Sequence, residues 1–221
     1  METVPVPPVR LICFDLGGVL VRICRSWREG CERAGLQVYD DLDAPAARAA
    51  RTHWAHQYQL GRIDCDTFAR GLSDAVGGRY TPEQVRAIHD AWIIAEYPGV
   101  AGLLRRLNES VGLTTAILSN TNHGHWARLI PGVNGGEFPS LGLVRRPYAS
   151  HLLGLAKPDP AIYRAFELRA QVTPGDVLFF DDLEENVAAA RACGWRAERI
   201  DHEGDTVAQI VERLATHGVN V

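Results

Sequence analysis

Three short apolar segments of this chain each end in polar or ionisable side chains. The segments are 11–14, 116–118 and 177–180, and the residues that follow them are Asp15, Ser119 with Asn120, and Asp181 with Asp182. Buried strands of parallel sheets are near-continuous apolar runs of this length. Open α/β sheets bind their ligands beyond the carboxyl ends of such strands. The sequence therefore predicts a parallel sheet with a polar site along one edge.

Helical patterns alternate with these segments. Helices are expected over 100–108, 160–169, 186–193 and 205–216, and further strands over 148–153 and 196–200. Alternating strands and helices imply right-handed crossovers and a parallel sheet. The predicted fold class is α/β with a doubly wound parallel sheet. A glycine-rich stretch, residues 133–139, is expected to form an exposed loop.

Residues 21–97 differ in character from the rest of the chain. They contain alanine-rich and amphipathic helical patterns, and we expect no strand among them. The predicted organisation is a sheet-containing core of residues 1–20 and 98–221, with an inserted helical unit of residues 21–97.

The first polar site follows the first apolar segment. Gly17 and Gly18 allow the chain to turn sharply after Asp15 and bring backbone amides close to an anion. A carboxylate beside N–H donors suits a magnesium ligand or an attacking nucleophile. Taken alone, the segment fits an ordinary glycine turn with a solvated Asp15 equally well.

Composition excludes several classes of protein. A net charge of −4 over 221 residues, without runs of Lys or Arg, argues against nucleic-acid binding. No apolar stretch is long enough to span a membrane, and residues 1–10 read as a short tail without a signal-peptide pattern. The five cysteines show no metal-binding or disulfide spacing. We expect a cytoplasmic monomer or homodimer.

Four motifs in order resemble those of the haloacid dehalogenase (HAD) superfamily. They are Phe14-Asp-Leu-Gly17, Leu118-Ser-Asn-Thr-Asn122, Lys157-Pro158, and Phe180-Asp-Asp182 followed by Asn186. The residues of these motifs are most similar to those of the bacterial sugar-phosphate phosphatase branch, which includes a glucose-1-phosphate phosphatase. The resemblance covers nearly the whole chain and implies a Rossmann-like core with an inserted α-helical cap (subfamily I).

The resemblance also implies roles for the motif residues. The Mg²⁺ ligands would be Asp15, the Gly17 carbonyl and Asp182, with Asp181 close by, and Asn186 would fix the Asp181–Asp182 loop. Asp15 would be the nucleophile and Lys157 would neutralise charge. Phosphate would be bound by Gly17, Gly18, Ser119, Asn120 and Lys157. Each residue has an ordinary alternative: Ser119 and the aspartates as helix caps, and Lys157 as a solvated lysine.

The expected function is Mg²⁺-dependent hydrolysis of a small phosphorylated metabolite, with a sugar phosphate as the expected class, through an aspartyl-phosphate. Most phosphatases of this superfamily carry a general acid at the position of Gly17, and glycine there removes a rate factor of roughly 10² to 10⁴ unless another group replaces it. The alternatives are a 2-haloacid dehalogenase and a catalytically weak phosphate-binding or regulatory protein.

Other residues are candidates for completing the site. Replacement proton donors could be His123, His125, Arg22 or Arg25. Helical residues that could contact substrate are Arg48, Arg51, His53, Trp54, His56, Tyr58 and Gln59.

Overall fold

A five-stranded parallel sheet forms the centre of the molecule. The computed structural model describes residues 8–131 and 136–221. The strands are β1 (Leu11–Phe14), β4 (Thr114–Ser119), β5 (Arg146–Ala149), β6 (Val177–Asp181) and β7 (Arg196–Arg199), in the order β5-β4-β1-β6-β7. β1 is central, and the chain winds outward from it in both directions. The predicted doubly wound α/β fold is confirmed.

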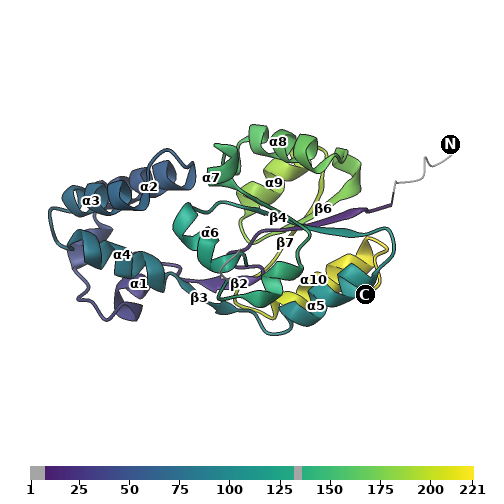
Figure 1. Cartoon of the computed structure of the whole chain (residues 1–221), viewed down its shortest axis with the longest axis horizontal. Coiled ribbons are helices and arrows are strands. Elements are labelled where there is room, and N and C mark those ends of the chain that lie inside the picture. Colours follow the sequence, from purple (N-terminus) through teal and green to yellow (C-terminus); the bar gives the residue numbers. More distant parts are fainter. Residues whose placement is uncertain (1–7, 132–135) are drawn as a thin grey trace.

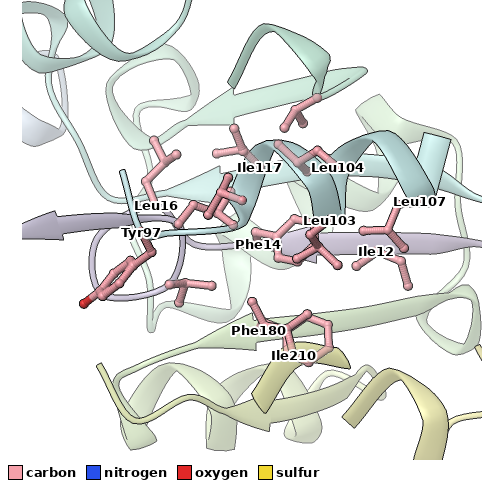
Figure 2. Close-up of a cluster of buried hydrophobic side chains, with 14 of the residues drawn as sticks. Ile12, Phe14, Leu16, Tyr97, Leu103, Leu104, Leu107, Ile117, Phe180 and Ile210 are labelled. Carbon is pink, nitrogen blue, oxygen red and sulfur yellow. The ribbon is translucent and has the colours of Figure 1, made fainter. Parts of the chain in front are cut away.

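Helices cover both faces of this sheet (Figure 1). α5 (Val100–Glu109) and α10 (Thr206–Thr216) lie on one face, and α8 (Pro160–Ala170) and α9 (Glu184–Ala192) lie on the other. Successive side chains of β1 point to opposite faces of the sheet. Ile12 and Phe14 belong to the cluster with α5 that Figure 2 shows, whereas Leu11 and Cys13 pack with α8 and α9. This burial on both faces explains why β1 is apolar along its whole length.

Four helices between β1 and β4 form a separate helical unit, seen at the left of Figure 1. They are α1 (Trp27–Arg33), α2 (Pro45–Gln59), α3 (Cys65–Ala75) and α4 (Pro82–Ala91), with a 3₁₀ turn at Asp40–Asp43. The unit has its own hydrophobic cluster, which includes Tyr58, Phe68, Leu72, Tyr80 and Ile88. The predicted helical character of this stretch agrees with the structure.

The expectation of no strand within 21–97 was wrong. β2 (Val21–Ile23) and β3 (Ile93–Glu96) pair antiparallel and form a two-stranded ribbon at the two ends of the helical unit. Strands of three and four residues are too short to show a two-residue periodicity. Their partners also lie far apart in sequence, so no hairpin signal marks them.

The expected strand over 148–153 was also only partly right. β5 ends at Ala149, and residues 150–153 form the short helix α7 (Ser150–Leu153), which ends at Gly154 in the left-handed conformation. A short apolar run does not distinguish strand from helix by its pattern.

The remaining elements are α6 (His123–Leu129) and the 3₁₀ turns Pro139–Leu143 and Pro174–Asp176. Most of the predicted tail, residues 1–10, and part of the predicted loop, residues 133–139, lie outside the described residues. Within residues 8–131 and 136–221, no helix has both the length and the apolar character needed to cross a bilayer.

Candidate active site

Three carboxylates meet at the carboxyl ends of two neighbouring strands. Asp15 follows β1, and Asp181 and Asp182 lie at the end of β6, which pairs with β1. The backbone N–H of Asp15 donates to the Phe180 carbonyl over 2.8 Å, which extends this pairing. One oxygen from each of the three carboxylates lies within 4.8 Å of the others. The sheet register thus brings together residues that are distant in sequence.

Lys157 lies between two of these carboxylates. Its Nζ donates to Asp15 Oδ1 over 2.9 Å and to Asp181 Oδ2 over 2.6 Å, and its side chain is 1% exposed. The ammonium group also lies 5.1 Å from the centroid of the Phe179 ring, where the face of the ring attracts a cation. A buried ammonium in this position can neutralise negative charge that gathers at Asp15.

The Asn120 side chain fixes the backbone of Lys157. Asn120 Nδ2 donates to the Lys157 carbonyl over 2.8 Å, and the Lys157 N–H donates to Asn120 Oδ1 over 2.9 Å. Asn120, at the end of β4, therefore determines where the lysine side chain begins. Ser119, the residue before it, is 3% exposed.

Burial and the neighbouring charges shift the pKa values of Asp15 and Lys157. Burial raises the pKa of Asp15 to about 6, Lys157 lowers it, and the Asp181 and Asp182 carboxylates raise it. For Lys157, burial lowers the pKa, but the attraction of Asp15 and Asp181 outweighs burial and raises it overall. The lysine is therefore a fixed positive charge at neutral pH, and Asp15 needs further positive charge to remain fully ionised.

Asp181 is held by hydrogen bonds on both oxygens. Asn186 Nδ2 donates to Oδ1 over 3.0 Å and to Oδ2 over 3.1 Å, and the Leu183 N–H donates to Oδ1 over 2.9 Å. Tyr163 Oη donates to the Asn186 carbonyl over 2.9 Å and so supports the Asn186 position. This arrangement fits the role expected of Asn186, which is to orient the aspartate loop.

Gly18 permits the close approach of the turn to the aspartates. It has φ +79, and a Cβ added there would meet Asp182 and Arg25 at less than van der Waals distance. Gly17 is different, because its φ does not require glycine and the three atoms nearest to an added Cβ all belong to the Ile23 side chain, with Cδ1 at 2.7 Å. The turn is closed by the Gly18 N–H, which donates to the Val21 carbonyl over 2.8 Å.

Asp182 has a partner that the sequence did not indicate. Arg25 Nη1 lies 2.7 Å from Asp182 Oδ2, and Asp182 is 4% exposed at its side chain. The sequence suggests Arg25 only as a replacement proton donor. Its guanidinium is permanently charged, so in this position it acts as a cation rather than as an acid.

The donor set at this edge of the sheet fits a magnesium ion. Three buried carboxylates face two cations, Lys157 and Arg25, and the remaining repulsion among the carboxylates favours a further cation. Carboxylate oxygens are the ligands that Mg²⁺ prefers, together with water and phosphate oxygens.

A cavity of about 510 Å³ opens beside these residues. Gly17, Ser119 and Asn120 line one end, and the helical unit supplies much of the rest. This volume lies within the range of small-molecule sites, about 300–1,000 Å³. Asp15, Lys157, Asp181 and Asp182 do not line the cavity, which meets the candidate site at Gly17, Ser119 and Asn120.

The cavity separates the candidate residues into two groups. His53, Trp54, His56, His123 and Arg22 do not line it. Trp54 packs against the hydrophobic cluster of the helical unit, and His53 and His56 lie on the outside of α2. The candidates that do line the cavity are Arg25, Arg48, Arg51, Tyr58, Gln59 and His125.

Sequence reasoning missed several lining residues. Trp27, Phe68 and Trp92 form apolar walls, and Thr52 and Ala55 lie on the same helix face as the arginines. The i, i+3, i+4, i+7 spacing along α2 is the signal that could have identified the last two.

Helices α4 and α6 meet through a pair of histidines. The rings of His89 and His125 stack with centroids 3.7 Å apart. His125 Nε2 donates to the His89 carbonyl over 2.8 Å, and Asn122 Nδ2 lies 3.0 Å from His89 Nε2. Burial lowers the pKa of both imidazoles, and for His125 the neighbouring His89 lowers it further. Both rings are therefore neutral at neutral pH.

Comparison with known proteins agrees with this geometry. The sequence pattern of haloacid dehalogenase-like hydrolases matches residues 9–194. The chain therefore belongs to the haloacid dehalogenase-like hydrolase family, and it is a hydrolase. D-ribitol-5-phosphate phosphatase from Bacteroides thetaiotaomicron is 28% identical over 89% of this chain and 94% of that protein.

Solved structures show the same fold. A crystal structure of a HAD family enzyme from Bacteroides thetaiotaomicron superposes with a TM-score of 0.76 and 22% identity, over 92% of this chain and 99% of that one. A further structure of that enzyme contains magnesium and inorganic phosphate, with a TM-score of 0.69 and 22% identity over 89% and 96% of the two chains.

Proposed function

We propose that this hydrolase is a Mg²⁺-dependent phosphatase of small phosphate monoesters. The observation that carries the proposal is the position of Lys157, whose ammonium bonds both Asp15 and Asp181 beside a third carboxylate, Asp182. The ribitol-phosphate substrate in the name of the Bacteroides relative supports a phosphorylated polyol or sugar as the substrate class.

Asp15 is the proposed nucleophile. Its carboxylate oxygen attacks phosphorus in line, the ester P–O bond breaks, and the leaving oxygen takes the electron pair and gains a proton from water to become the alcohol. Water then attacks the aspartyl-phosphate, which releases inorganic phosphate and regenerates Asp15. Lys157 stabilises the negative charge that develops on the phosphoryl oxygens during both steps. Ser119, Gly17 and Gly18 are the proposed neutral contacts of the phosphate.

Asp15, the Gly17 carbonyl and Asp182 are the proposed ligands of the magnesium ion, with Asp181 beside them. When bound, the ion supplies positive charge to the phosphoryl oxygens and keeps Asp15 ionised. Asn186 orients Asp181 through its two hydrogen bonds.

The helical unit is the proposed cap of residues 21–97 over a core of residues 1–20 and 98–221. It encloses the cavity from the side opposite the sheet and so excludes water from the reacting phosphate. Because Gly17 supplies no acid, leaving groups that need little protonation, such as the anomeric oxygen of a sugar 1-phosphate, are favoured.

Asp15→Asn is the direct test. Phosphate release from a panel of monoesters should require Mg²⁺ in the wild type and fall at least about 10³-fold in Asp15→Asn. Asp74→Asn, at an exposed position of α3, is the matched control and should retain full activity. Magnesium-dependent activity that survives in Asp15→Asn would contradict the mechanism.

The same screen tests the two alternatives. A dehalogenase would release halide from 2-haloacids without magnesium, and the paired Asp181 and Asp182 argue against that chemistry. A silent phosphate-binding protein would bind phosphate with no turnover of any ester.

A further inference from the structure

The charged side chains that line the cavity are all arginines. Arg25, Arg48 and Arg51 line it, and among the described side chains no Asp or Glu does. The chain as a whole carries a net charge of −4, so this local excess of positive charge runs against the overall composition. Arg25 pairs with Asp182, and the other two arginines lie on α2.

Two of these arginines lie on the part of α2 that is remote from the core: the Gln59 carbonyl, at the C-terminal end of α2, accepts from Ser150 Oγ, and Arg48 and Arg51 lie about two to three helical turns earlier. Arg48 and Arg51 share one face of α2 with Thr52, Ala55 and Gln59, since positions three and four apart align on a helix. The near end is formed by the motif residues at the ends of β1 and β4. The cavity therefore runs from these motif residues toward the two arginines of α2.

The surroundings of Arg51 favour recognition over simple solvation. The Arg51 guanidinium lies 5.6 Å from the centroid of Trp27, and a guanidinium over a ring keeps its N–H donors at its edge. Arg48 is exposed, and among the side chains that the structure describes it has no ion-pair partner. Trp27, Phe68 and Trp92 add apolar walls, which strengthen an ionic contact by excluding water.

We propose that Arg48 and Arg51 bind a second anionic group, a carboxylate or a phosphate, on the far side of the phosphate ester. The proposal rests on the phosphatase function proposed above and narrows its substrate class to doubly anionic metabolites. Planar guanidinium groups bind carboxylate or phosphate oxygens through paired hydrogen bonds, so both groups fit the same chemistry.

Matched pairs of substrates test this. 2-Phosphoglycolate and 2-hydroxyethyl phosphate differ in having a carboxylate or a neutral hydroxyl at the same distance. Fructose 1,6-bisphosphate and fructose 1-phosphate differ in the second phosphate. We expect the wild type to show a kcat/KM at least about tenfold higher for the charged member of one pair. The pair that shows this preference identifies the anion.

Arg48→Met and Arg51→Met should each lower kcat/KM for the charged member by about ten- to hundredfold and leave the neutral member within about twofold. Arg51→Lys keeps the charge and should retain part of the preference, which separates charge loss from misfolding. Arg70→Met, at an exposed position of α3 outside the cavity, is the matched control and should change neither substrate.

The outcomes separate the two proposals. Hydrolysis of both members of each pair at equal rates, or equal losses for both members in the Arg48 and Arg51 variants, overturns the second-anion site and leaves the phosphatase proposal intact. Failure of the wild type to hydrolyse any ester with Mg²⁺ overturns both.

Discussion

Arg25 Nη1 lies 2.7 Å from Asp182 Oδ2 and so joins the segment between β2 and α1 to the end of β6. Asp182 is nearly buried, whereas the Arg25 side chain is a third exposed. The pair therefore stabilises a carboxylate that would otherwise be desolvated without a charge partner. It also places a fixed cation next to a proposed magnesium ligand.

Arg25→Met should lower stability mainly when magnesium is absent. Loss of this partly buried pair is expected to cost about 1–2 kcal/mol, or about 3–6 °C in Tm, in the presence of EDTA. Mg²⁺ should narrow the deficit, because a cation bound at Asp182 replaces the lost charge. Thermal unfolding with EDTA and with saturating Mg²⁺ measures both effects.

Arg28→Met is the control for this prediction. Arg28 pairs with Asp40 over 3.3 Å, and both side chains are exposed, so its loss should change stability by less than about 0.5 kcal/mol. An Arg25→Met deficit that is equal with and without Mg²⁺ would show that the cation and Arg25 do not share Asp182.

Gly17→Asp should speed the hydrolysis of simple alkyl phosphates once space is made for it. A Cβ at this position would lie 2.7 Å from Ile23 Cδ1, the end of a flexible side chain, and Ile23→Val removes that atom. The double variant Gly17→Asp/Ile23→Val adds a carboxylic acid beside the leaving group, and its rate should rise about tenfold or more. Steady-state phosphate release measures this.

Gly17→Asn/Ile23→Val is the matched comparison, because it adds similar bulk without a transferable proton. Equal rates for the Asp and Asn double variants would show that the missing acid does not limit the reaction. Ile23→Val alone should cost about 0.5–1.5 kcal/mol of stability.

His125→Gln should weaken the dependence of stability on acid pH. Burial lowers the pKa of His125 well below its ordinary value of 6.5, so below about pH 6.5 the unfolded chain binds the proton that the folded chain does not. The free energy of unfolding therefore falls as the pH drops, by about 1.4 kcal/mol per pH unit for one such group. Glutamine keeps a donor for the His89 carbonyl but does not titrate.

Urea unfolding between pH 7 and pH 5 measures this difference. The wild type should lose about 1–2 kcal/mol more than His125→Gln over that range. His56→Gln, at an exposed position of α2, should behave as the wild type. Parallel pH profiles for the wild type and His125→Gln would contradict the prediction.

Much of the core fold could be predicted because its strands are buried on both faces. β1, residues 116–118 of β4, and residues 177–180 of β6 are uniformly apolar, and the polar residues Asp15, Ser119 and Asp181 follow them, so these strands could be recognised from the sequence. Lys157 contacts Asp15 and Asp181, which follow or end the neighbouring parallel strands β1 and β6. Parallel strands place these two residues along one edge of the sheet.

The rest depends on contacts between distant segments. β2 and β3 stabilise each other across the whole helical unit, and neither has a local pattern. The Arg25–Asp182 pair and the stacked His89 and His125 rings arise only when the helical unit packs on the sheet. Among the candidates on α2, Arg48 lines the cavity and His53 does not, because the two positions lie on different faces of the helix.

The β2–β3 ribbon has a mechanical consequence. The chain crosses between the sheet and the helical unit twice, and the two crossings are hydrogen-bonded to each other along Val21–Ile23 and Ile93–Glu96. They therefore form one paired connection rather than two independent tethers. A movement of the helical unit about this connection would change the cavity, because residues of both parts line it. Asp15, Lys157 and Asp181 would keep their mutual distances, because all three are anchored on the sheet side of the connection.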